Sequence, residues 1–307
     1  MLDSRYKRTS TDQIDLVRER NKIPEISRNV NQYASILAKK SLIFMSFRPY
    51  LAGFRLALSQ ELVHRSNFLI GRLRDFILFA ALIFLFQHVP QGVQNWDQHE
   101  LLTYTLISAF ISTQLSAQAM HTIANEITDG DLTNFLLRPF NYLGYWTARL
   151  TAVRLLAFIG GLASVALLLV LFPGIRLALP QDLETWIIGG ALLLGSIILM
   201  QLIDFMAGLL SFWTNRAYGP RFLIWILVQF MSGAFLPIDA FPEWAQSLLS
   251  FTPFPSLIFA PIKTFIRGVD PNTLSILSTQ LFWITFLGAL LFILWKKGIK
   301  KYAAYGR

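Results

Sequence analysis

From Trp186 to Trp213 the chain is mostly apolar and carries a single charged side chain, Asp204, and this feature limits the fold most strongly. A helix needs about 20 such residues to cross the roughly 30 Å hydrocarbon layer of a bilayer. Hydrophobic residues make up 54% of the 307-residue chain and charged residues 15%, against roughly 25% charged residues in soluble domains. A soluble fold of this size cannot bury so much apolar surface, so we predict an integral membrane protein.

Six apolar segments are predicted to span the membrane, which makes the fold class an all-α integral membrane protein. Five of them are close to or above the length that a spanning helix needs, and the fifth in chain order is shorter. Their approximate ranges are 68–88, 101–124, 144–172, 186–213, 222–235 and 274–295. The chain therefore divides into a six-helix transmembrane domain over 45–307 and a preceding tail.

The residues before the first span form two different segments. Residues 1–44 mix charged and polar side chains without an apolar core, which predicts a partly disordered cytoplasmic N-terminal tail. In 47–66, Leu51, Phe54 and Leu58 recur at helical spacing among charged residues. This stretch is too polar to cross the bilayer, so we predict an N-terminal helix that lies in the membrane interface.

A proline-rich apolar stretch separates the fifth span from the sixth. Two short helices fit here, over 242–251 and 256–267, and neither is long enough to span. Irregular backbone at membrane depth has to be shielded by protein or by a water-filled cavity. We therefore predict a re-entrant helical hairpin that enters from the outer side.

The orientation follows from the distribution of lysine and arginine. If both termini are cytoplasmic, the outer segments are 89–100, 173–185 and 236–273. Of the 27 basic residues in the chain, these segments hold only Arg176, Lys263 and Arg267. Basic residues concentrate in cytoplasmic loops. The same placement near helix ends explains the net charge of +9 without nucleic acid as a partner.

The loop after the second span contains a candidate docking site for a cytoplasmic partner. Thr128 and Asp131 have the spacing of a capping box, and Leu132, Phe135 and Leu136 then fall on one face of a short helix. Amphipathic helices of this kind either rest on lipid or dock a partner, and both interpretations are open from the local pattern. The candidate docking residues are Asp129, Gly130, Asp131, Leu132, Phe135, Leu136, Arg138 and Pro139.

Polar residues inside the spans are candidates for a translocation path. They are Gln114, Gln118, Gln201, Asp204 and Gln229. The glutamines either line a path or bond to neighbouring helices, and the second interpretation is the default. For Asp204 a proton relay is one interpretation. Because no basic partner is evident at its depth, a structural Asp204 that is neutral or hydrogen-bonded is favoured.

Several kinds of chemistry are excluded by what the sequence lacks. It has no cysteine, and its four histidines show no metal-ligand spacing. It contains no Walker motif, no G-x-S-x-G and no H-E-x-x-H. We therefore predict no catalytic residue, no metal site and no cofactor bound by this chain.

The order of these elements resembles a known family. An interfacial helix precedes six spans, Gly-Asp-Leu-x-x-x-Leu-Leu-Arg-Pro over 130–139 follows the second, and Leu-Pro-Ile-Asp-Ala-Phe-Pro-Glu-Trp over 236–244 precedes the last. The chain resembles the permease subunit of bacterial ABC exporters of the second type, in particular their permease-component branch. The segment after the second span resembles the coupling helix of that family.

The resemblance implies a function as well as partners. Two permease subunits, identical or homologous, would pair in the bacterial inner membrane, and each would bind a separate ATPase subunit. That partner would hold ATP and Mg, and transport would proceed by alternating access. Two alternatives remain. An ion-coupled secondary transporter would use mid-membrane ionisable groups, and a membrane-bound lipid enzyme would need a cluster of His, Asp or Glu at one interface, which the sequence lacks.

Overall fold

The fold is known from a computed structural model that describes most of the chain after residue 46. The described residues are 47–63, 65–87, 96–115, 119–173, 177–178, 180, 182–214 and 218–304. All regular elements within these residues are helices, which confirms the all-α class. The predicted N-terminal tail lies outside the described residues, as does Gln118.

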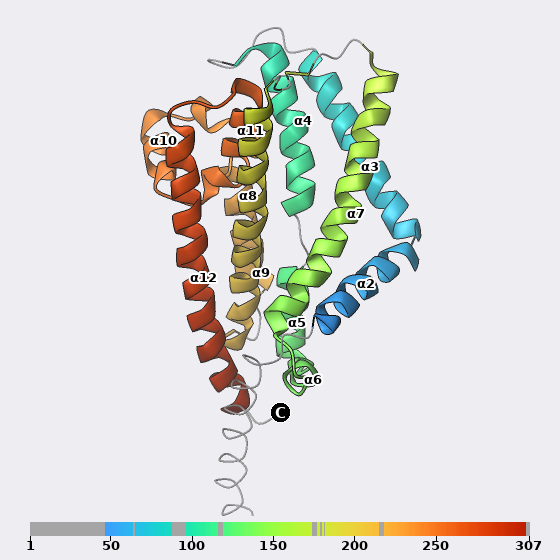
Figure 1. Cartoon of the computed structure of the whole chain (residues 1–307), viewed down its shortest axis with the longest axis vertical. Coiled ribbons are helices and arrows are strands. Elements are labelled where there is room, and N and C mark those ends of the chain that lie inside the picture. The colour runs from blue at the N-terminus through green and yellow to red at the C-terminus, as the bar shows by residue number, and fades with distance from the viewer. Residues whose placement is uncertain are drawn as a thin grey trace, which may run out of the picture.

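Long helices run roughly parallel to the longest axis of the molecule (Figure 1). They are α3 (Arg65–Gln87), α4 (Gln98–Leu115), α7 (Tyr142–Leu171), α8 (Leu183–Leu209) and α12 (Thr273–Ala304). Within the described residues, three helices are long and apolar enough to cross a membrane by length and composition alone: Tyr142–Leu171, Leu183–Phe212 and Thr273–Tyr302. These three coincide with the predicted third, fourth and sixth spans.

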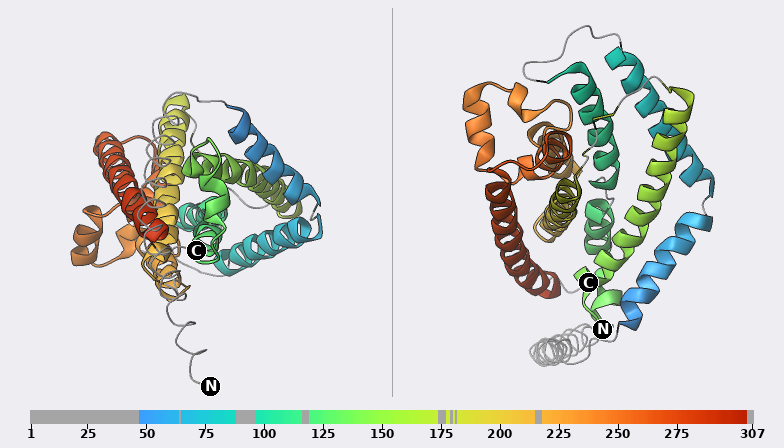
Figure 2. Two further views of the ribbon diagram at one scale, coloured as in Figure 1. Left: turned by 90° about the horizontal axis from the view of Figure 1, so that it is seen from below. Right: turned by 45° about the horizontal axis from the view of Figure 1, so that its top comes forward.

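The other predicted spans are also helical, with different bounds. The predicted second span comprises α4 and α5 (Ala119–Thr128), and residues 116–118 between them are not described. The predicted fifth span, 222–235, corresponds to α9 (Tyr218–Met231). This helix has 14 residues, so the prediction that the fifth span is short is confirmed. The predicted interfacial helix is α2 (Arg48–Val63), which lies obliquely on the outside of the bundle (Figure 2).

The proline-rich stretch folds back onto the bundle as two short helices, α10 (Glu243–Ser250) and α11 (Phe259–Arg267). The Tyr104 hydroxyl donates to the carbonyl of Gly233, whose φ of +82° favours glycine. Ser108 on the same helix, α4, donates to the carbonyl of Ala234 at 2.6 Å. Protein thus covers the irregular backbone after α9. We call the end of the bundle that carries α10 and α11 the hairpin end (Figure 1).

A buried glutamine joins this hairpin to two long helices. The amide nitrogen of Gln280 on α12 donates to the carbonyl of Leu192 on α8 at 3.0 Å and to that of Ser256 at 3.1 Å. Gly195 on α8 lies directly against this amide, so a Cβ at that position would overlap it. The hydrogen bonds satisfy the buried amide donor and fix the register of α8 against α12.

Candidate docking segment and buried polar cluster

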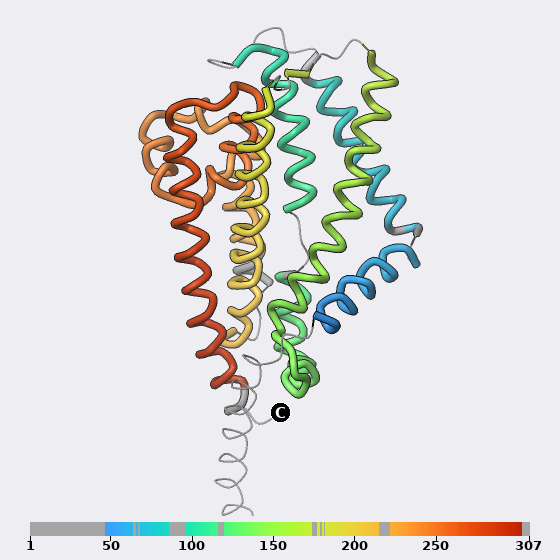
Figure 3. Tube along the Cα trace, viewed as in Figure 1, coloured from blue at the N-terminus to red at the C-terminus, as the bar shows by residue number. Residues whose placement is uncertain are grey.

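Residues 129–139, which we call the docking segment, connect α5 to α7 at the end of the bundle opposite the hairpin end (Figures 1 and 3). The segment contains one short helix, α6 (Leu132–Leu136). The last turns of α12 reach the same end of the molecule (Figure 3). We call this end the docking end.

The predicted capping box is wrong. Thr128 is the last residue of α5, and its hydroxyl donates to the carbonyl of Asn125 at 3.2 Å within that helix. Asp131 stands at the N-cap of α6, but its φ of −64° and ψ of −22° are helical and its side chain makes no cap hydrogen bond. A capping side chain works from an extended N-cap backbone, which neither residue provides here.

The apolar face of α6 points into the chain's own bundle, not outward as predicted. Leu132 is fully buried, with 0% of its surface exposed. Phe135 packs edge-on against Tyr142 with ring centroids 5.4 Å apart, and Leu136 is partly buried against the same core. The spacing of apolar residues identifies the apolar face of a helix, but it does not show which surface that face packs against. Here the nearest apolar surface belongs to α5 and α7.

The surface that the docking segment presents outward is made by other residues. Leu137 directly after α6 is 74% exposed, although it is a large apolar side chain. Asp129, Asp131, Arg138 and Pro139 are exposed beside it. Leu137 was missed from the sequence because it falls off the periodic face that Leu132 begins. Four of the eight predicted docking residues therefore lie at the surface, as exposed side chains: Asp129, Asp131, Arg138 and Pro139.

Contacts from two long helices hold the docking segment in place. At the end of α5, the Glu126 carboxylate accepts hydrogen bonds from the Tyr142 hydroxyl and from Trp146 Nε1, both on α7. Burial raises the pKa of the Glu126 carboxyl, and these hydrogen bonds lower it in part. On α12, the Tyr302 hydroxyl donates to the carbonyl of Gly130 at 2.8 Å. The docking segment is thus bonded directly to α12 and packs on α7 through Phe135, while Glu126 joins the preceding helix, α5, to α7.

Replacing Tyr302 with phenylalanine should loosen the docking segment while leaving the bundle folded. The change removes the bond to Gly130 and a second contact of 2.9 Å with the Thr133 hydroxyl. One such bond contributes about 1 kcal/mol, so amide hydrogen exchange over 131–134 should accelerate about fivefold. Exchange in the middle of α8 serves as the control. Unchanged exchange over 131–134 would show that Tyr302 does not restrain the segment.

A polar cluster is buried between α4, α7 and α8. Arg154 on α7 donates from Nη1 to Oε1 of Gln201 at 2.6 Å and from Nε to the carbonyl of Gln114 at 3.2 Å. The side chains of Arg154 and Asp204 are 8% and 3% exposed, and their charges attract each other. Arg154 Nη2 and Asp204 Oδ2 have no hydrogen-bond partner among the described residues. The cluster is therefore a buried arginine that is hydrogen-bonded to α8 and α4, with an acid on α8 near enough to attract it, although no ion pair of 4.0 Å or less joins the two in the described residues.

This cluster corrects the expectation that Asp204 has no basic partner. Arg154 supplies that partner, 50 positions away in the sequence, and was missed because only packing brings the two helices together. Gln114, Gln201 and Asp204 of the predicted path residues meet in the cluster. Gln229 lies partly buried on α9, outside it.

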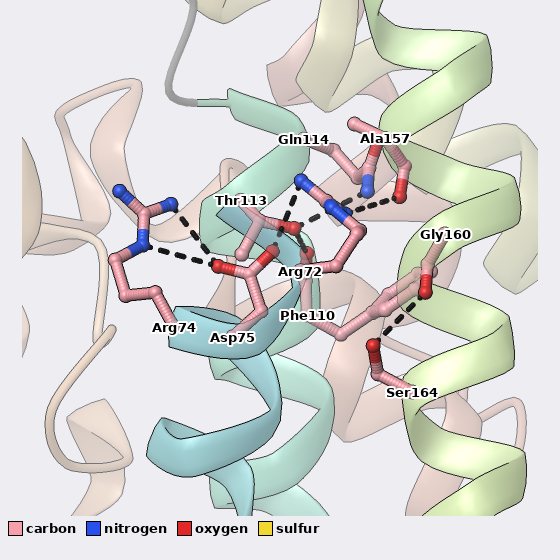
Figure 4. Close-up of polar contacts among 9 residues, drawn as sticks. All are labelled: Arg72, Arg74, Asp75, Phe110, Thr113, Gln114, Ala157, Gly160 and Ser164. Carbon is pink, nitrogen blue, oxygen red and sulfur yellow. Dashed lines mark hydrogen bonds and ion pairs between the residues drawn. The ribbon is translucent and has the colours of Figure 1, made fainter. Parts of the chain in front are cut away.

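A second buried acid lies on α3, where the sequence analysis placed no candidate. Asp75 is 1% exposed and forms ion pairs of 3.0 Å with Arg72 and Arg74 (Figure 4). Arg72 also donates to the carbonyl of Ala157 on α7 at 3.0 Å, and Gly160 leaves space for its side chain (Figure 4). This arrangement joins α3 to α7 through a charge network.

A helical bundle with three membrane-length apolar helices in its described part is typical of a polytopic membrane protein. Residues 74–306 match the model of a family described as ABC-2 family transporter protein, and the chain therefore belongs to this family. It is an ABC transporter permease, a membrane component that acts in transport. No curated protein matches the chain. The match begins within α3 and covers the docking segment, the polar cluster and the hairpin, but not α2.

Proposed function

We propose that this chain is the permease subunit of an ATP-driven exporter, and that a separate ATPase subunit binds the docking segment. The observation that carries the proposal is the position of this segment in an ABC-2 family chain. It is exposed at one end of the bundle, it packs on α7 through Phe135, and it is bonded to α12 through Tyr302. A push on such a segment would move both helices together.

The mechanism that we propose is alternating access between two paired permease subunits. ATP, with Mg, would bind to the ATPase pair, and closure of that pair would displace both docking segments. Gln114, Gln201 and Asp204 are buried and bonded within the polar cluster or attracted to Arg154. Their burial favours a role in holding α4, α7 and α8 together over a role in lining the path.

The test is reconstitution of the permease with a candidate ATPase. Permease and ATPase should co-purify, and the permease in lipid vesicles should stimulate ATP hydrolysis. The matched control is the same ATPase with its Walker lysine replaced by alanine, which should still bind but should not hydrolyse ATP. Failure of every candidate ATPase to bind at matched membrane levels would contradict the proposal.

A second function is supported by one observation. Asp204 lies buried beside Arg154, and mid-membrane ionisable pairs are typical of ion-coupled secondary transporters. In such a protein a pH gradient alone would drive substrate uptake into vesicles without ATPase. Under our proposal, substrate would move only when ATPase and ATP are both present.

We further propose six spans in the bacterial inner membrane, with both termini cytoplasmic and α10 and α11 entering from outside. Labelling of single cysteines tests this orientation without background, since the chain has no cysteine. Glu184→Cys, exposed at the start of α8, should react with a membrane-impermeant maleimide in intact cells. Lys300→Cys, exposed near the end of α12, should react only after permeabilisation. The reverse labelling pattern would show that the protein has the opposite orientation in the membrane.

A further inference from the structure

Helix α2 has one face that is packed and one that is open. On the packed face, the Tyr50 hydroxyl accepts a hydrogen bond from the backbone N–H of Asn141 at 3.2 Å. Gly53 lies against the ring of Tyr145, and Gln60 accepts from Arg149 at 2.8 Å. These contacts with α7 and the residue before it fix the rotation of α2 about its own axis. The opposite face must therefore point away from the bundle.

The open face carries two arginines in an apolar surrounding. Arg48 and Arg55 are seven residues apart, which places them on the same side of a helix. Both are exposed, and no ion pair within the described residues involves either of them. Together with the residues between and after them they line a shallow hollow on α2. These lining residues, which we call the arginine stripe, are Arg48, Leu51, Ala52, Arg55, Leu56 and Ser59.

We propose that the arginine stripe binds the phosphate headgroups of anionic phospholipids in the leaflet next to the docking end. Guanidinium groups form bidentate hydrogen bonds with phosphate, which suits Arg48 and Arg55. Leu51 and Leu56, 41% and 45% exposed, lie beside them and would contact the first carbons of the acyl chains. The only acid of α2 is Glu61, beyond the last residue of the stripe, so it does not neutralise the site.

Other occupants of this face fit the observations less well. An acidic protein segment would match the two positive charges, but it would not match the apolar side chains that lie between them. Helix α2 also flanks the long apolar helices of the bundle (Figure 1). An amphipathic helix with basic residues and exposed leucines is the arrangement that binds anionic membrane surfaces. The proposal does not depend on the presence of an ATPase.

Native mass spectrometry of the full chain in detergent tests this proposal, with dioleoyl phosphatidylglycerol or phosphatidylcholine as the added lipid. The wild-type protein should retain phosphatidylglycerol in preference to phosphatidylcholine. Arg48→Gln combined with Arg55→Gln should weaken phosphatidylglycerol binding by about tenfold or more. Each basic side chain near an anionic surface strengthens binding by about fivefold, and the double variant removes two of them. Arg55→Lys, which keeps the charge but not the bidentate geometry, should lose less binding than Arg55→Gln.

The matched control removes two positive charges elsewhere on the same protein. Lys296→Gln combined with Lys297→Gln, both exposed on α12, should leave phosphatidylglycerol binding unchanged. Equal loss in both double variants would overturn the proposal, because net charge alone would then explain the binding. Displacement of the lipid by inorganic phosphate would show a free-anion site and would also overturn it. If the double variant does not fold, Arg55→Gln alone is tested in its place, and its loss of phosphatidylglycerol binding is compared with the same lysine control.

Discussion

Replacing Arg154 with leucine is expected to destabilise the folded permease by about 2–6 kcal/mol, because two buried acceptors lose their donor at about 1–3 kcal/mol each. The two acceptors are Oε1 of Gln201 and the carbonyl of Gln114. Arg154 is 8% exposed and Asp204 3%, so the change would also remove the positive charge that attracts Asp204 in a water-poor interior. Unfolding in detergent, followed by helical circular dichroism, measures this loss.

A double variant separates the charge effect from a simple loss of packing. Arg154→Leu combined with Asp204→Asn removes both charges, and it should recover a substantial part of the lost stability. Asp204→Asn alone should destabilise as well, because the Arg154 guanidinium then lacks its opposite charge. If the double variant were as unstable as the sum of the two single variants, the two residues would not be energetically coupled.

Hydropathy was sufficient to predict the helices of this fold, because burial in lipid imposes long apolar segments that are visible in a single sequence. The ranges predicted for the third and fourth spans lie within a few residues of helices α7 and α8, and the predicted sixth span begins next to the start of α12 but ends at 295, whereas α12 continues to Ala304. The short fifth segment also corresponds to a short helix, α9. In each case the signal is local, so it does not depend on how the helices pack.

Features that depend on packing between distant segments were not predicted. Arg154 and Asp204 lie on helices whose pairing no local pattern reports, so Asp204 was taken to be isolated. Tyr302 reaches the docking segment across 172 positions of sequence. The docking segment itself was located correctly as a short helix after the second span, but which side of it faces outward was reversed. An amphipathic pattern in a five-residue helix cannot distinguish a core contact from a partner contact.

The reversed orientation of the docking segment leads to a prediction about its outward surface. Under the proposed function, Leu137→Glu should weaken ATPase binding by roughly 10–100-fold. Leu137 is 74% exposed, and burying a leucine in an interface stabilises it by about 1.5–3 kcal/mol, which a carboxylate would reverse. The permease itself should remain as stable as the wild type, because Leu137 is not part of the buried core. Co-purification of the ATPase at matched membrane levels measures the effect.

Two further variants make this result specific to the docking segment. Leu183→Glu changes a leucine with the same 74% exposure at the start of α8, and it should leave ATPase binding unchanged. Leu132→Ala changes a fully buried leucine of the segment, and it should lower the unfolding stability of the permease by about 2–5 kcal/mol. ATPase binding by the Leu132 variant should therefore fall only as its folded fraction falls. Undiminished recovery of the ATPase with Leu137→Glu would mean that the docking segment presents no binding surface there, and the segment would be a connector resting on lipid.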